Sequence, residues 1–234
     1  MIYKDFQDLK LSALGMGCLR LPINGGQGDI DVEATKKMVA YAFEKGINYY
    51  DTAWGYHGGK SETVLGEILK EYPRDSFYLA TKFPGYDAGN MNKVEEIFEE
   101  QLKKCQVEYF DFYLFHANSA ERHKKFTETR AYDIVQELKA EGKIRHVGMS
   151  FHDTADVLDQ MLTKHPEIEV VQIQFNYVDF EDEKVESRKC YEVCRKHGKP
   201  VLVMEPVNHL FASVTPEEYV SMLVMSVSTG QSLD

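Results

Sequence analysis

The sequence predicts an α/β fold: a (β/α)8 barrel of the TIM type, incomplete or abbreviated after its seventh strand. Short apolar runs recur along the chain, and helical patterns lie between them, as in a parallel sheet. Six of these runs occupy residues 47–53, 77–83, 110–117, 144–151, 170–177 and 200–207. They are almost continuously apolar, as expected for strands buried on both faces. No Gly-x-Gly-x-x-Gly motif follows the first strand, so the regular series favours a closed barrel over an open sheet.

Amphipathic segments fill the intervals between these strands. They lie at residues 31–46, 61–72, 92–105, 127–143 and 186–199. Several stop at a glycine, which is typical of a helix C-terminus. Residues 3–22 precede the first of these helices, and we expect them to form a short hairpin that leads into the first barrel strand.

The C-terminal region departs from the repeat. Thr215, Pro216 and the two glutamates that follow resemble a helix start, which predicts a helix over residues 216–226. Alternatively, residues 223–228 form an abbreviated eighth strand. We expect residues 1–234 to be a single barrel domain, with a clear pattern over 1–207 and a shortened tail over 208–234.

Composition excludes several classes of protein. The formal net charge of the 234 residues is -11, which argues against a nucleic-acid partner. There is no apolar stretch long enough to cross a membrane and no signal-peptide pattern at the start. Four cysteines in a chain of this size do not make a disulfide framework. These features predict a cytoplasmic protein with no nucleic-acid or membrane partner.

Polar residues interrupt the apolar runs near their C-terminal ends. They are Asp51, Lys82, His116, Ser150 and Glu205. The C-terminal ends of parallel barrel strands converge on one face, where such barrels carry their active sites. Burying these groups apart from one another would cost roughly several kcal/mol each, so we expect them to form a network.

Tyr56 follows Asp51 closely and lies in a loop on the same face. A phenol has a pKa of about 10, which makes it a poor proton donor at neutral pH. A nearby ammonium lowers that pKa, and a carboxylate keeps the ammonium charged and in place. Asp51, Lys82 and Tyr56 therefore suggest a tuned acid, and His116 is suited to stabilise a developing alkoxide. Each residue alone would more often be structural, so the prediction depends on the combination.

Other residues have two interpretations. Cys190 and Cys194 lie four apart on a helix, but no further pair has zinc-finger spacing, so we expect reduced cysteines and no metal site. Trp54 either lines a substrate pocket or packs its loop. His57 and the glycines after it are expected to shape a turn.

Several segments together resemble the aldo-keto reductase family. They are LGMGCLRLP (14–22), GINYYDTAWGYHGGKSETVLGEIL (46–69), ATKFP (80–84), DFYLFHA (111–117), GKIRHVGMSFHD (142–153), VVQIQFNY (170–177) and PVLVMEP (200–206). The spacing of the aspartate and tyrosine, followed by the Ser-Glu pair and a glycine, is highly specific. The lysine and histidine strands follow in the family's order.

The resemblance implies an NADPH- or NADH-dependent oxidoreductase that reduces an aldehyde or ketone. It assigns Tyr56 as proton donor, Lys82 and Asp51 as the residues that tune it, and His116 as the residue that orients the carbonyl. It also implies that Ser150 and Gln172 bind the nicotinamide carboxamide. Further residues expected at the cofactor are Arg20, Asp51, Met204 and Glu205.

The chain also departs from the family pattern. Phe151 stands where many members have asparagine, and Met204 where an aromatic residue usually stacks on the nicotinamide. The wording around Ser150 resembles a bacterial or archaeal branch whose members often carry a C-terminal iron–sulfur region, and its cysteine cluster is absent. The segments that grip the adenosine phosphate are missing or compressed. A second hypothesis is therefore a truncated, catalytically weak or inert barrel that senses a cofactor or acts in regulation. A third is a lyase that forms a Schiff base on Lys82.

Overall fold

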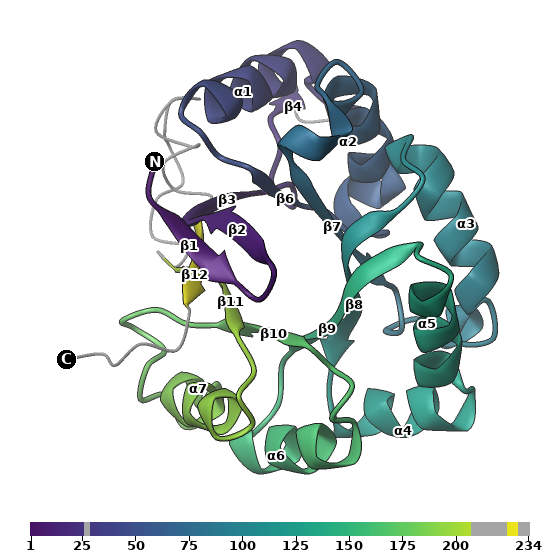
Figure 1. Cartoon of the computed structure of the whole chain (residues 1–234), viewed down its shortest axis with the longest axis vertical. Helices are drawn as coiled ribbons and strands as arrows, with labels where there is room; N and C mark the ends of the chain where they lie inside the picture. The colour runs from purple at the N-terminus through teal and green to yellow at the C-terminus, as the bar shows by residue number, and fades with distance from the viewer. Residues whose placement is uncertain (26–28, 207–223, 229–234) are drawn as a thin grey trace.

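A closed barrel surrounded by helices forms the centre of the molecule in the computed structural model, which describes residues 1–25, 29–206 and 224–228 (Figure 1). Its strands are β3 (Leu14–Gly17), β6 (Tyr49–Asp51), β7 (Tyr78–Phe83), β8 (Phe110–Asn118), β9 (Ile144–Phe151), β10 (Val170–Gln174), β11 (Val201–Met204) and β12 (Val224–Ser228). Around the barrel they follow the order β10-β11-β12-β3-β6-β7-β8-β9. The predicted barrel fold is confirmed, and each of the six predicted apolar runs contains one of its strands.

The eighth position of the barrel differs from an all-parallel arrangement. β12 pairs antiparallel with β11, where Val201 lies opposite Ser228, and antiparallel with β3, where Val224 lies opposite Met16. The abbreviated strand expected at 223–228 is therefore present, and it closes the sheet. The alternative helix over 216–226 lies outside the described residues, apart from its last three residues, which belong to β12.

The helices pack around the outside of the barrel (Figure 1). They are α1 (Val32–Glu44), α2 (Ser61–Leu69), α3 (Val94–Cys105), α4 (Ala120–Glu128), α5 (Ala131–Ala140), α6 (Ala155–Lys164) and α7 (Ser187–Lys196). Short 3-10 turns are η1 (Tyr56–Gly59), η2 (Arg74–Ser76) and η3 (Ala88–Asn90). The predicted segment 127–143 contains the last turn of α4 and all of α5. α6 and most of α4 were not predicted.

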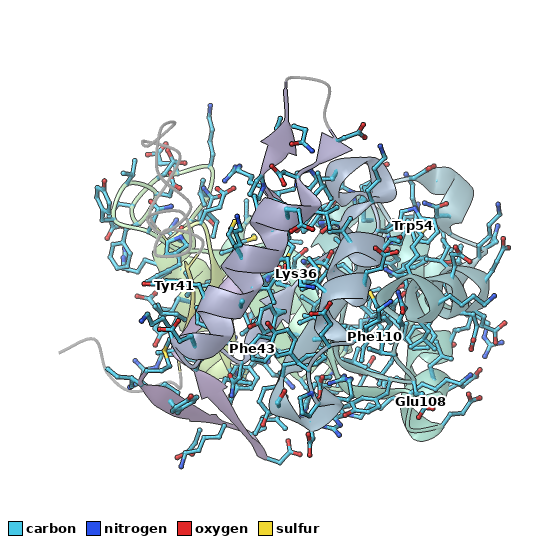
Figure 2. The ribbon with its side chains drawn as sticks, turned by 90° about the horizontal axis from the view of Figure 1, so that it is seen from above. Lys36, Tyr41, Phe43, Trp54, Glu108 and Phe110 are labelled. Atoms are coloured by element: carbon cyan, nitrogen blue, oxygen red, sulfur yellow. The ribbon has the colours of Figure 1, made fainter. Side chains whose placement is uncertain are left out.

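Aromatic side chains attach α1 to the barrel wall (Figure 2). Phe43 of α1 stacks on Tyr72 with ring centroids 3.8 Å apart and on Tyr50 of β6 at 5.2 Å. The helix begins at Asp31, whose side chain accepts a hydrogen bond from the Ala34 N–H at 2.9 Å. This cap and the buried aromatic face explain why the segment predicted from its apolar spacing forms a helix here.

An N-terminal hairpin closes one end of the barrel, as predicted (Figure 1). It consists of β1 (Tyr3–Phe6) and β2 (Leu9–Ser12). Phe6 and Leu11 are buried against Tyr49 and Phe112, which point into the barrel interior. This end carries the N-termini of the parallel strands and is filled by apolar side chains.

A second hairpin, β4 (Ile23–Asn24) with β5 (Asp29–Ile30), was not predicted and lies at the opposite end (Figure 2). This opposite end is the mouth of the barrel, where the C-termini of the parallel strands meet. Among the described residues, no helix has the length and apolar character needed to cross a membrane.

Candidate active site

Buried polar side chains converge at the mouth of the barrel from neighbouring strands. Asp51 ends β6, Lys82 lies on β7, Ser150 on β9 and Gln172 on β10. All four are at most 4% exposed. Gln172 lies directly opposite Ser150 in the ladder between β9 and β10. Groups buried this deeply need partners, and Asp51 accepts hydrogen bonds from both Lys82 and Gln172.

Lys82 is the centre of this network. Its Nζ donates to Asp51 Oδ1 at 2.5 Å, to the Thr52 carbonyl at 2.9 Å and to the Tyr56 hydroxyl at 3.2 Å. These three bonds use the three donors of the ammonium group. Gln172 Nε2 donates to the second oxygen of Asp51 at 3.1 Å. The sequence therefore placed Asp51, Tyr56 and Lys82 together correctly.

Electrostatics keep the lysine charged and the phenol protonated. Burial by itself would lower the pKa of Lys82, but the Asp51 carboxylate and the Tyr56 oxygen outweigh it, and the pKa is raised. Burial raises the pKa of Tyr56, while the Lys82 ammonium opposes that effect. The expected lowering by Lys82 is thus present, but the effect of burial on the pKa of Tyr56 is larger.

His116 faces the Tyr56 ring from β8. The two ring centroids are 5.7 Å apart with an interplanar angle of 78°. Burial, followed by the charge of Lys82, lowers the pKa of His116 to about 2, so the imidazole is neutral at physiological pH. Its Nδ1 is buried, and neither ring nitrogen has a hydrogen-bond partner in the described part of the chain. A neutral imidazole retains one N–H donor and one acceptor.

Ser150 retains hydrogen-bonding capacity as well. Its Oγ accepts from the Ala117 N–H at 2.7 Å. Ala117 has a φ of 51° and follows a register shift in the ladder between β8 and β9, which turns this N–H toward the serine. The Ser150 hydroxyl hydrogen has no acceptor among residues 1–25 and 29–206. A buried hydroxyl with a free donor is suited to hold a ligand carbonyl.

Arg20 and Glu205 lie beside each other at the rim of the mouth. Arg20 Nη2 is 3.8 Å from Glu205 Oε1, and both side chains are partly exposed, at 48% and 29%. Met204, the last residue of β11, lies next to Glu205 and is half-buried. Phe151, the last residue of β9, is buried in the hydrophobic core. Of the residues expected at the cofactor, Ser150, Gln172 and Met204 lie on β9–β11, Arg20 and Glu205 lie at the rim, and Asp51 lies on β6.

The loop after β6 resolves two open interpretations. The Lys104 ammonium of α3 lies 3.6 Å from the centroid of the Trp54 ring, so Trp54 packs between its loop and α3. Figure 2 shows Trp54 on this outer side of the barrel. His57 Nε2 accepts from the Leu21 N–H at 2.8 Å, and its φ of 51° belongs to the tight turn that the sequence predicted.

The contact between Tyr86 and Gly55 at the mouth was not predicted from the sequence. Tyr86, in the loop after β7, lies edge-on to His116 with ring centroids 5.2 Å apart. Its hydroxyl rests on Gly55, where a Cβ would collide with it. His116 is thus flanked by two phenols, Tyr56 and Tyr86. The contact depends on the conformations of two loops, and the sequence of neither loop predicts it.

The described residues contain no group of three or more histidine, cysteine, aspartate or glutamate side chains arranged to hold a metal ion. Cys190 and Cys194 are buried free thiols on the inner face of α7. Burial raises the pKa of both thiols, to about 12 for Cys190, so both are protonated at neutral pH.

Comparison with known proteins decides the family. The sequence profile of the Aldo/keto reductase family matches residues 13–221. The chain belongs to the aldo/keto reductase family. The match covers every strand that contributes a polar residue to the mouth, and it places the Asp51–Lys82–Tyr56 network in a known family context.

Curated family members are similar along most of this chain. A probable aldo-keto reductase from Glycine max is 31% identical over 219 residues, covering 88% of this chain and 58% of its own length. The NADH-specific methylglyoxal reductase of Escherichia coli is 31% identical over 235 residues, covering 91% of this chain and 69% of its own. The chain thus spans less than two thirds of the soybean relative.

Solved aldo-keto reductases share the fold. One from Bacillus halodurans in its holo form has a TM-score of 0.68 at 25% identity, covering 93% of this chain and 71% of its own. One from Klebsiella pneumoniae in complex with NADPH has a TM-score of 0.63 at 22% identity, covering 86% and 67%. These likenesses support the barrel architecture described above.

Proposed function

We propose that this protein reduces an aldehyde or ketone with NADPH or NADH, and that Tyr56 donates the proton. The observation that carries the proposal is the position of the Lys82 ammonium, which contacts the Asp51 carboxylate and the Tyr56 hydroxyl at the same time. A phenol held against a buried, paired ammonium can release its proton, because the phenolate that remains is stabilised.

The proton transfer follows from these contacts. Tyr56 gives its proton to the carbonyl oxygen as that oxygen gains negative charge, and Lys82 stabilises the phenolate. Asp51 keeps Lys82 charged throughout, because the pair is buried together. The neutral His116 can donate one hydrogen bond to the same oxygen without adding a charge. When bound, the reduced nicotinamide supplies the hydride that reaches the carbonyl carbon.

The residues on the other side of the mouth fit a nicotinamide. A carboxamide offers both a carbonyl acceptor and an N–H donor, and the free Ser150 hydroxyl hydrogen matches the acceptor. Gln172 lies beside it in register, held by Asp51. Met204 would lie against the ring, with Arg20 and Glu205 at the rim. Relatives described as NADH-specific or solved with NADPH support either cofactor.

The proposal is tested in two steps. Fluorescence quenching with NADPH and NADH measures binding, and loss of nicotinamide absorbance with a generic aldehyde measures turnover. Tyr56→Phe is expected to lower turnover by about 10³-fold while leaving the cofactor Kd nearly unchanged. Tyr50→Phe is a matched control, because that phenol faces outward from β6 and, among the described residues, donates a hydrogen bond only to the Ile47 carbonyl, at 3.3 Å. Turnover that survives in Tyr56→Phe would rule out the proton-donor role.

A catalytically weak or inert barrel that senses a nicotinamide cofactor is the alternative. The antiparallel β12 favours it, since the eighth strand of this barrel runs opposite to the other seven. Tight cofactor binding without turnover by the wild-type protein would select this alternative. A Schiff-base lyase is disfavoured because Lys82 is charged, and an amine must be neutral to attack a carbonyl.

A further inference from the structure

Arg122 lies in the first turn of α4, just after the C-terminal end of β8 at the mouth of the barrel. Its Nη1 donates to the Ala117 carbonyl at 2.5 Å, and Ala117 directly follows His116 in the chain. The same Ala117 donates its N–H to Ser150. The guanidinium is therefore attached to the segment of β8 that positions His116.

The charge of Arg122 is not compensated within the part of the chain that the structure describes. No aspartate or glutamate in residues 1–25 and 29–206 lies within ion-pair distance of it. The other arginines of these ranges form ion pairs, except the exposed Arg195: Arg20 with Glu205, Arg74 and Arg145 with Asp111, Arg130 with Asp133, and Arg188 with Glu181. Arg122 is half-buried.

The acids nearest to Arg122 in the chain do not neutralise it. Glu121, its neighbour on α4, pairs with Lys125 at 2.5 Å. The formal net charge of the protein is -11, so acidic residues outnumber basic ones and a cation without an acidic partner is unusual in this chain. Lys82 and Arg20, the other cations placed at the mouth, are already paired with Asp51 and Glu205. Arg122 is thus an available cation next to the reacting groups, and its charge contributes to lowering the pKa of His116 after burial and Lys82.

We propose that Arg122 selects carbonyl substrates that carry a negatively charged carboxylate or phosphate group. The guanidinium provides a planar set of donors that suits both groups, and its link to Ala117 holds it in place. Tyr86, which flanks His116, would form the wall of the pocket. This inference rests on the proposed reductase function and specifies its substrate class.

The test compares substrates that differ only in charge. With the wild-type protein, kcat/KM for 4-carboxybenzaldehyde is expected to exceed that for its neutral methyl ester by at least about tenfold. Arg122→Gln should lower kcat/KM for the acid by about 30-fold, and by at least about tenfold more than it lowers kcat/KM for the ester. Arg122→Lys, which keeps the charge, should recover part of the loss. Glyceraldehyde 3-phosphate against glyceraldehyde then shows whether phosphate is accepted as well as carboxylate.

Arg195→Gln is the matched control. It removes the same charge from an exposed, unpaired arginine in the last turn of α7, and both substrates should be unaffected. Calorimetry with the alcohol products gives a readout independent of turnover: Arg122→Gln should lose affinity for 4-(hydroxymethyl)benzoate and not for its methyl ester.

Three results would overturn the inference. Equal losses for the acid and the ester would show that Arg122 only supports Ala117. A raised Kd for NADPH in Arg122→Gln would place the guanidinium at the cofactor. An acid no better than its ester in the wild type would remove the preference itself. The reductase proposal fails in a different way, since then neither aldehyde would be consumed by the wild-type protein with either cofactor.

Discussion

The two ends of the barrel each bury a carboxylate at a strand, and they use it differently. At the closed end, Asp111 at the start of β8 is fully buried. Its oxygens accept from Arg74 at 2.6 Å, from Arg145 at 2.9 Å and from the Leu79 N–H at 2.9 Å. The two guanidinium groups also enclose the Tyr109 ring, at 4.0 and 4.3 Å. Both oxygens of the carboxylate are therefore paired within the chain, although Arg74 Nε beside it has no hydrogen-bond partner among the described residues.

At the mouth, Asp51 also has hydrogen-bond partners, but these partners lie next to polar groups that could still form further hydrogen bonds. Lys82 bridges Asp51 to Tyr56, whose O–H has no acceptor among the described residues. The ring nitrogens of His116 and the Ser150 hydroxyl hydrogen likewise have no hydrogen-bond partner among the described residues. Buried polar groups normally pair completely, and at the mouth several unpaired groups lie close together around Tyr56, so this cluster marks where a ligand belongs. The difference between the ends can be tested by substituting one member of the ion pair at each end.

Lys82→Met should have the largest effect. It removes the cation beside Tyr56, and we expect turnover to fall by about 10³-fold or more. It also leaves Asp51 buried without its partner, which should cost about 3 kcal/mol in the free energy of unfolding. Aldehyde kinetics and urea unfolding measure the two effects. Lys104→Met, which removes the ammonium from Trp54 on the outer side, should keep most of the turnover.

Asp111→Asn tests the closed end. Both arginines lose a charged partner, but they are 25% and 45% exposed, so water compensates part of the loss. We expect the free energy of unfolding to fall by about 2 kcal/mol. kcat/KM should stay within about twofold at temperatures where the variant is folded, since the mouth is distant. A large loss of kcat/KM with unchanged stability would contradict the division between the two ends.

The sequence predicted the mouth better than it predicted the layers around it. Asp51, Lys82 and His116 could be placed together because parallel strands in a barrel end on one face, whatever the loops do. The direction of β12 could not be foreseen, because apolar periodicity does not distinguish a parallel strand from an antiparallel one. The contact between Tyr86 and Gly55 arises from the conformations of two loops, which residue types alone do not fix.

The two unpredicted helices differ in how much signal they carried. α4 contains a single buried residue, Phe126, so no apolar stripe marks it. α6 buries Ala155, Leu158, Met161 and Leu162, which repeat with helical spacing. Its signal was present, but the short interval between β9 and β10 concealed it. The direction in which the pKa of Tyr56 shifts could not be predicted from the sequence either, because it depends on how deeply the phenol is buried.

Acid should destabilise the two ends in different pH ranges. His116 at the mouth has its pKa lowered from 6.5 to about 2, first by burial, so the unfolded chain binds a proton that the folded chain does not. Stability linked to His116 is therefore lost as the pH falls below 6.5. At the closed end, burial opposes the effects of His146, Lys139 and the Val147 N–H on Glu169, but these partners prevail and lower its pKa from 4.5 to about 2. Its contribution is lost only below pH 4.5.

Urea unfolding from pH 8 to pH 3 separates the two ranges. His116→Leu should reduce the slope of the unfolding free energy against pH between 6.5 and 4.5, where His123 and His152, whose pKa values burial also lowers, keep part of it. The steeper fall below 4.5 should stay in place. Glu169→Gln should do the reverse. Identical pH profiles for the two variants would show that the ends are not titrating independently.

Gly55→Ala should have the smallest effect, confined to the mouth. The added Cβ would collide with the Tyr86 hydroxyl, and that flexible side chain must move away from His116. We expect KM for an aldehyde to rise about threefold, with the free energy of unfolding within about 0.5 kcal/mol of the wild type. The double variant Gly55→Ala/Tyr86→Phe removes the colliding oxygen, and the next ring atom, Cζ, lies 3.4 Å from the new Cβ, an ordinary contact. KM should then return toward the value of Tyr86→Phe alone. If the double variant keeps the full defect, the effect comes from the backbone of the Tyr56 loop, and Tyr86 is not a wall of the substrate pocket.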